Sequence, residues 1–202
     1  MTPPANCRLR YDAPRARDTL SSTVATILSA LDVPARRLAY VCIGTDRSTG
    51  DALGPLVGDR LQVALPAQVE VLGTLANPVH ASNLEDALAD LGQRLPGAAI
   101  IAVDACLGRA ESVGSVTAGL GALVPGAGVN KTLPQVGSAH VTGTVNVGGF
   151  MEYFVLGNTR LHLVVEMAEV IAASLVAATG LVLREGAESA WPAHVASALA
   201  ER

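Results

Sequence analysis

The chain has few aromatic residues and few cysteines, and each scarcity excludes a class of protein. Only 3% of its 202 residues are aromatic although half are hydrophobic, so the core must be built from Val, Leu, Ile and Ala in closely packed layers. That composition favours an α/β fold. The three cysteines, Cys7, Cys42 and Cys106, form no C-x-x-C pair, which argues against a disulfide framework and a zinc knuckle. We therefore expect reduced thiols and a cytoplasmic location.

The sequence also lacks a basic run and a leader-like apolar segment. The net charge is −4 and the pI is near 5.5, which does not favour a nucleic-acid partner. Residues 1–17 contain no signal-type apolar run, and we interpret them as a loose arm before a single domain over 18–202. The most apolar window, 161–183, contains Glu166 and Glu169, so it is interpreted as a buried helix and not as a membrane span.

Short apolar runs alternate with helical patterns in the first half of the chain. Residues 38–43, 69–75 and 98–103 are apolar runs typical of strands buried on both faces. Leucines at helical spacing predict helices between them, over 51–65 and 84–95. The βαβαβ order predicts an α/β fold with a mostly parallel sheet and helices on both faces.

The flanking patterns predict further elements without fixing their order in the sheet. We expect an amphipathic first helix that Asp18 caps and a last long helix that ends at Gly180. Segments 112–117 and 140–147 are candidate short strands. The tail to Arg202 is predicted to form a peripheral helix.

Two segments place carboxylates at the edge of the sheet where ligands bind in open parallel sheets. Asp51 lies where the loop after the first buried strand becomes a helix, and Asp104 follows the third buried strand. Alone, Asp51 could equally be a helix N-cap, and Asp104 a loop-anchoring acceptor. Together they offer acid–base catalysis, in which one ionised carboxylate activates a water and its protonated partner supports the carbonyl oxygen or the leaving amine.

Other residues near this edge are weaker candidates. His140, which lies among glycines, could enter the cleft as a metal ligand or proton shuttle, although a structural histidine is the commoner role. Cys106 could act as a nucleophile with His140 as its base, but buried structural cysteines are much commoner. Asp46 could be a third acid, and we favour a solvated ion pair with Arg47. The glycine-rich loop 44–54 matches no nucleotide-binding motif.

Several long motifs, in the same order along the chain, resemble the YyaC family of sporulation proteins. They are Cys42-Ile-Gly-Thr-Asp-Arg-Ser-Thr-Gly-Asp-Ala-Leu-Gly-Pro55, Gly73-Thr-Leu, Pro78-Val-His80, Ala102-Val-Asp-Ala-Cys-Leu-Gly-Arg109, Pro125-Gly-Ala-Gly128 and Asn146-Val-Gly-Gly-Phe-Met-Glu-Tyr153. The resemblance extends roughly from Tyr40 to Leu175. It implies a phosphorylase/hydrolase-like α/β fold, a three-layer sandwich.

That family is similar to the germination protease of spore-forming bacteria, an aspartic-type endopeptidase with an acid pair in a D-A-L-G-P and an I-A-x-D-A segment. Here those segments are Asp51-Ala-Leu-Gly-Pro55 and Ile101-Ala-Val-Asp-Ala105. The resemblance implies a peptidase with Asp51 and Asp104 as catalytic residues and a protein or peptide as substrate. It also implies a sporulation or germination setting, inside the sporulating cell or the spore, and we expect a homo-oligomer.

The same fold is shared by hydrogenase maturation proteases, in which two acidic residues and a later histidine gather a nickel ion. By this resemblance Asp51, Asp104 and His140 could hold a divalent metal, while no other cofactor is expected. A metal-dependent maturation peptidase, a non-catalytic binding module on the same fold, and a nucleoside or glycosyl hydrolase remain alternatives.

Overall fold

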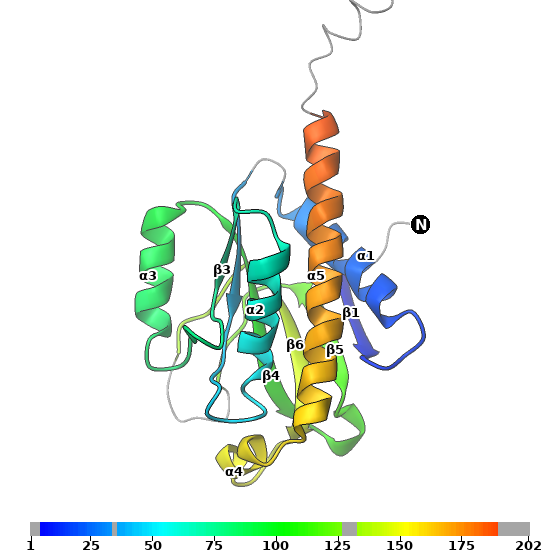
Figure 1. The fold of residues 1–202 in the computed structure, drawn as a ribbon, viewed down its shortest axis with the longest axis vertical. Coiled ribbons are helices and arrows are strands. Elements are labelled where there is room, and N and C mark those ends of the chain that lie inside the picture. The colour runs from blue at the N-terminus through cyan, green and yellow to red at the C-terminus, as the bar shows by residue number, and fades with distance from the viewer. Residues whose placement is uncertain (1–4, 34–35, 127–132, 190–202) are drawn as a thin grey trace, which may run out of the picture.

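A six-stranded sheet with the strand order β1-β5-β6-β4-β2-β3 forms the centre of the molecule (Figure 1). The computed structural model describes residues 5–33, 36–126 and 133–189. The strands are β1 (Asn6–Arg10), β2 (Leu38–Cys42), β3 (Val69–Leu72), β4 (Ala99–Gly108), β5 (Ser115–Leu120) and β6 (Ala139–Val147). The helices are α1 (Ala16–Ala30), α2 (Leu53–Ala64), α3 (Leu84–Arg94), α4 (Glu152–Gly157) and α5 (Leu161–Ser189), with a 3₁₀ turn at Ala110–Ser112.

The predicted parallel sheet is confirmed. Strand β2 pairs in parallel with β3 on one side and with β4 on the other, and β4 pairs in parallel with β6. Strand β5 is antiparallel to both of its neighbours, β1 and β6. All five residues of β2 are buried, as expected for a strand covered on both faces.

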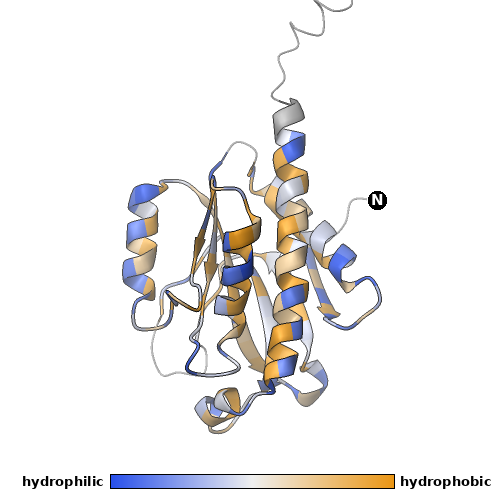
Figure 2. Cartoon of the chain, in the orientation of Figure 1, coloured by the Kyte–Doolittle hydropathy of each residue, from blue (hydrophilic) through white to orange (hydrophobic). Residues whose placement is uncertain are grey.

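Helices cover both faces of the sheet, which confirms the three-layer arrangement. Helices α1, α2 and α5 pack on one face, where Leu28, Val57 and Ile171 join strand residues in the larger core cluster. Helix α3 lies on the other face, where Leu84 and Leu91 pack on β2 and β4 in a second cluster. Both faces of the central strands are therefore apolar, while α3 alternates hydrophilic and hydrophobic residues (Figure 2).

Close approach of α2 to β2 depends on glycine. A Cβ atom on Gly54 would lie 2.0 Å from the main-chain oxygen of Ile43, far inside van der Waals contact. A side chain there would push the start of α2 away from the strand. Gly54 therefore holds the start of α2 against the end of β2, where Asp51 lies.

The N-terminal arm differs from the prediction. Asn6–Arg10 is strand β1, paired in antiparallel register with β5 at the sheet edge. Its exposure alternates, with Cys7 and Leu9 packed against the core and the arginines facing outward. The alternation of apolar and polar residues in this strand is short, and the charged residues around it made it hard to recognise in the sequence. A segment interpreted as a loose arm thus belongs to the domain.

Several element ends also differ from the prediction. Strand β4 continues to Gly108 because β6 pairs with it along this length, so Asp104 lies within the strand and not after it. Helix α1 begins at Ala16, and Asp18 lies in its first turn without capping it. Helix α5 continues through Gly180 because packing of its apolar face outweighs the cost of one glycine, about 1 kcal/mol.

The long helix α5 is apolar enough to satisfy a membrane-span criterion by composition. Half of its most apolar window is buried inside the domain, and Figure 2 shows polar residues breaking the apolar stretch. It packs against α1 and α2 in the larger core cluster, as a core helix does. The predicted helix in the tail that ends at Arg202 lies outside the described residues.

Candidate active site

The candidate site lies where β2 ends beside β4, next to Asp104 within β4. After β2 the chain turns at Gly44, whose N–H donates to Val79 O at 2.8 Å. The loop then returns, and the N–H of Thr45 donates to the main-chain oxygen of Asp51 at 3.2 Å. The turn brings Asp51 back to the end of β2, next to β4.

Asp51 is free of the structural role that its position suggests. Helix α2 has Ala52 as its N-cap residue, and no side chain caps it. The Asp51 carboxyl is half-buried, and burial raises its pKa above the ordinary value. The hydroxyl of Ser48 opposes part of this rise in the pKa. That hydroxyl is buried and has no hydrogen-bond partner among the described residues, so its contact with Asp51 is weak.

Asp104 has the most perturbed carboxyl of the site. Its Oδ1 accepts a hydrogen bond from the N–H of Ala105 at 2.8 Å. Burial raises its pKa well above the ordinary range, the Ala105 N–H opposes the rise, and the negative charge of Asp51 adds to it. The fold therefore brings the two predicted carboxyls into each other's electrostatic field. Such a pair favours one protonated and one ionised member.

His140 does not point into this pair. It lies on β6 opposite Ala102, which is two residues before Asp104 on β4. Its Nδ1 is 3.0 Å from the main-chain oxygen of Gly121, the residue that follows β5, so this ring nitrogen is hydrogen-bonded to the backbone there. Within residues 5–33, 36–126 and 133–189 no three His, Cys, Asp or Glu side chains are grouped to hold a metal. The residues present therefore do not fit a site made of Asp51, Asp104 and His140.

The two other candidates have ordinary surroundings. Cys106 is half-buried, its Sγ lies 3.4 Å from Thr144 Oγ1, and burial raises its pKa, which disfavours a nucleophilic thiolate. Asp46 is exposed. The Nε of Arg47 contacts Thr45 Oγ1 at 3.3 Å, and no ion pair with Asp46 is present in the described part of the loop.

The short helix α4, which the sequence did not predict, lies against the loop that carries Asp51. The N–H of Gly50 donates to Leu156 O at 2.9 Å, which ties α4 to the loop that carries Asp51. Asn146 on β6 donates through Nδ2 to Val155 O at 3.1 Å. The sequence motif that begins at Asn146 extends into this segment, but a helix of six residues is too short to give a clear helical pattern.

An exposed apolar patch lies at α4, beside the loop of Asp51. Both phenylalanines of the chain belong to it, with Phe150 82% exposed and Phe154 60% exposed. Tyr153 is 77% exposed and packs edge to face against Phe154. We call Phe150, Met151, Tyr153 and Phe154 the α4 patch. Exposed apolar clusters of this kind typically mark a surface that contacts another molecule.

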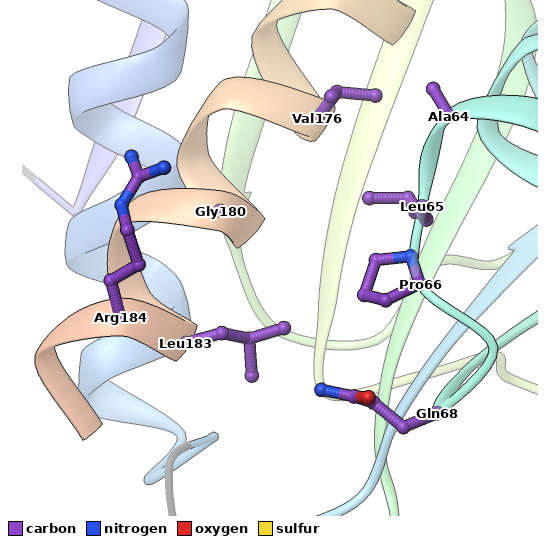
Figure 3. Close-up of a pocket in the computed structure, with 8 residues that line it drawn as sticks. All are labelled: Ala64, Leu65, Pro66, Gln68, Val176, Gly180, Leu183 and Arg184. Atoms are coloured by element: carbon purple, nitrogen blue, oxygen red, sulfur yellow. The ribbon is translucent and has the colours of Figure 1, made fainter. Parts of the chain in front are cut away.

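A pocket of about 330 Å³ lies far from the two carboxyls (Figure 3). It lies between the C-terminal end of α2 and the second half of α5, whereas Asp51 precedes the N-terminal end of α2. Figure 3 shows its lining side chains, Ala64, Leu65, Pro66, Gln68, Val176, Gly180, Leu183 and Arg184. Arg184 is the only ionisable group among the described residues of this lining, which therefore offer no acid–base pair.

Comparison with known proteins places the chain in a family. The uncharacterized protein YyaC of Bacillus subtilis strain 168 is 54% identical over 154 residues, which are 75% of this chain and 75% of that protein. A solved structure, the [NiFe] hydrogenase maturation protease HycI from Thermococcus kodakarensis, is similar with a TM-score of 0.44 and 18% identity, over 77% of this chain and 99% of that one. The model of the family described as a protein of unknown function, DUF1256, matches residues 8–174, and the chain belongs to this family, together with YyaC.

Proposed function

We propose that this protein is a peptidase that hydrolyses peptide bonds with Asp51 and Asp104. The observation that carries the proposal is the pair itself: two carboxyls where β2 ends beside β4, both with raised pKa values, and with the charge of one raising the pKa of the other. Environments that separate the pKa values of two neighbouring acids assign the roles of base and acid. Because the pKa of Asp104 is raised more strongly, we assign Asp104 as the acid and Asp51 as the base.

The proposed reaction uses one water and conserves protons. Ionised Asp51 accepts a proton from the water as its oxygen attacks the carbonyl carbon of the peptide, and protonated Asp104 donates its proton to the carbonyl oxygen. When the tetrahedral intermediate collapses, the C–N bond breaks and Asp51 gives its proton to the leaving amine. Asp104 recovers its proton from the hydroxyl of the intermediate. The products are a carboxyl group and an amine.

A polypeptide substrate is supported by the α4 patch. Its exposed aromatic side chains lie beside the loop of Asp51, tied to it through the Gly50–Leu156 hydrogen bond. A protein segment that packs on these rings would pass close to the acid pair. The sporulation or germination setting, in the cytoplasm of the sporulating cell or in the spore, is supported by the motifs that resemble the YyaC sporulation family.

The proposal is tested with Asp51→Asn and Asp104→Asn against a defined pool of random decapeptides. Asparagine keeps the size of aspartate but cannot exchange a proton, so each variant should stay folded and lose at least about a hundredfold in rate. Combining the two changes should add little, because either one breaks the same unit. Cleavage is read by mass spectrometry, with circular dichroism as the folding check.

Asp46→Asn is the matched control, because Asp46 is an exposed acid in the same loop. It should retain full activity. Unchanged turnover by either Asp51→Asn or Asp104→Asn would refute the mechanism. A wild-type protein that binds peptides of the pool without cleaving them would instead favour a binding module.

A further inference from the structure

Four polar residues stand in one row across the sheet. On β1, Arg8 is directly opposite Thr117 of β5, and Thr117 is directly opposite Thr142 of β6. Thr142 is in turn directly opposite Asp104 of β4. Directly opposite residues in a sheet project from the same face. The side chains of Arg8, Thr117, Thr142 and Asp104 therefore form a continuous line that starts at the candidate site and ends at the sheet edge.

This line lies on the face opposite α1, α2 and α5. Chain neighbours of the row, Val116, Val141 and Val103, belong to the core cluster beneath those helices, and alternate residues of a strand point to opposite faces. On the other face, the cluster beneath α3 includes no residue of β1, β5 or β6 in the described parts of the chain. Arg8 is exposed, the two threonines are half-buried, and the carboxyl of Asp104 is buried although part of the residue is exposed. The row from Arg8 to Thr142 is therefore accessible to a bound molecule, with Asp104 at its buried end.

The positive end of the row is available for a ligand. Arg10, the next arginine on β1, is held by both carboxylate oxygens of Asp12 and by Val113 O. Arg8 makes no hydrogen bond or ion pair through its side chain among residues 5–33, 36–126 and 133–189. Burial raises the pKa of Cys106, two residues beyond Asp104 on β4, and the positive charge of Arg8 opposes this rise only as the last of several causes.

From this row we infer a substrate track in which Arg8 binds the carboxylate of an Asp or Glu side chain of the polypeptide substrate. The inference rests on the proposed peptidase function. An arginine binds a carboxylate through paired N–H groups, and among the described residues Arg8 has no carboxylate of its own. Thr117 and Thr142 lie between Arg8 and Asp104, and their hydroxyls can donate to and accept from a peptide backbone.

The length of the track sets the position of the acidic residue. Three strand spacings separate Arg8 from Asp104, which amounts to about 14 Å at roughly 4.8 Å each. An extended peptide advances about 3.4 Å per residue, so this span corresponds to roughly four residues. The substrate should therefore carry Asp or Glu about four residues from the bond that the acid pair cleaves.

The test measures peptide capture without turnover. Immobilised Asp104→Asn protein is incubated with a pool of random decapeptides that have amidated C-termini, and captured peptides are sequenced by mass spectrometry. We expect captured peptides to be enriched at least about fivefold in Asp and Glu. Adding Arg8→Gln should abolish the enrichment, and Arg8→Lys should retain part of it. Arg37→Gln, an exposed arginine next to the opposite end of β2, is the charge-matched control and should change nothing.

Two results would overturn the inference. One is equal enrichment of acidic peptides with and without Arg8. The other is capture that requires a free C-terminal carboxylate, measured with the same pool as free acids. Cleavage of the pool by the wild-type protein is measured separately. If the peptidase proposal is wrong, the wild-type protein does not cleave the pool. If only the track is wrong, it cleaves the pool without a preference for acidic peptides.

Discussion

A Cβ atom on Gly44 would lie 1.9 Å from the main-chain oxygen of Asp51, and the φ angle of Gly44 is +144°. Both facts require glycine, because an L-residue with a side chain rarely adopts this φ and the overlapping atom belongs to the backbone. The close contact lets the loop return to the end of β2. The position of Asp51 beside Asp104 thus depends on the absence of a side chain at Gly44.

Gly44→Ala should therefore damage both the fold and the site. We expect a loss of at least about 2 kcal/mol in the free energy of unfolding, measured by urea denaturation, together with lost activity. Gly92→Ala is the control, because Gly92 is exposed within α3 and a Cβ atom there would meet nothing within 4 Å. It should gain up to about 1 kcal/mol. Equal stability of the Gly44 variant and wild type would show that the loop tolerates a shift.

The sheet was predictable because its central strands have a strong local signal. Residues 38–43 and 98–103 are continuous apolar runs, and both lie in the sheet as β2 and β4. Asp51 and Asp104 could be paired in advance because both follow such runs in the chain. Their positions along the chain were therefore enough to predict that these two carboxyls lie near each other.

The rest of the site depends on strand pairing that no local pattern specifies. His140 was expected in the cleft, but the register places it opposite Ala102 and its ring nitrogen on Gly121 O. Arg8 was assigned to a loose arm, and its alignment with Asp104 becomes visible only through β5 and β6. Contacts between segments distant in sequence are set by the whole sheet.

The pH dependence of stability should reveal the buried carboxyl of Asp104. Because its pKa is raised in the folded protein, its protonated form stabilises the fold below the ordinary pKa of 3.8, and this contribution is lost as pH rises through the folded value. Asp104→Asn removes the titration. The variant should match the wild type in melting temperature near pH 3.5 and exceed it at pH 8. At pH 8 the wild type loses about 1.4 kcal/mol in the free energy of unfolding for every unit by which the folded pKa of Asp104 is raised. An equal difference at both pH values would contradict the raised pKa.

Ser48→Ala should move the acid limb of the pH–rate profile to higher pH by a small amount, because the contact between Ser48 and Asp51 is weak. The Ser48 hydroxyl opposes the burial that raises the pKa of Asp51, so its removal lets that pKa rise further. The base is then ionised only at higher pH, and the rate at acid pH falls while the plateau rate is kept. Ser48→Thr retains a hydroxyl and should restore the profile. A uniform loss of rate at every pH would indicate a purely structural role for Ser48.

The α4 patch should matter for protein substrates and not for short ones. Replacing Phe150 and Phe154 with Ser removes two exposed rings, so the fold should be unaffected. If a protein substrate packs on these rings, its KM should rise at least about tenfold, since burying one Phe contributes about 1.5–3 kcal/mol. The kcat should stay unchanged because the acid pair is untouched.

A peptide too short to reach α4 separates this docking role from a positioning role. It should be cleaved equally well by the double variant and by the wild type. Val63→Ser is the control, because Val63 is 89% exposed on α2 and belongs to a different surface. If short peptides and proteins lose activity to the same degree, the patch acts through the Gly50–Leu156 hydrogen bond, by holding the loop of Asp51 in place, and substrate docking at α4 is refuted.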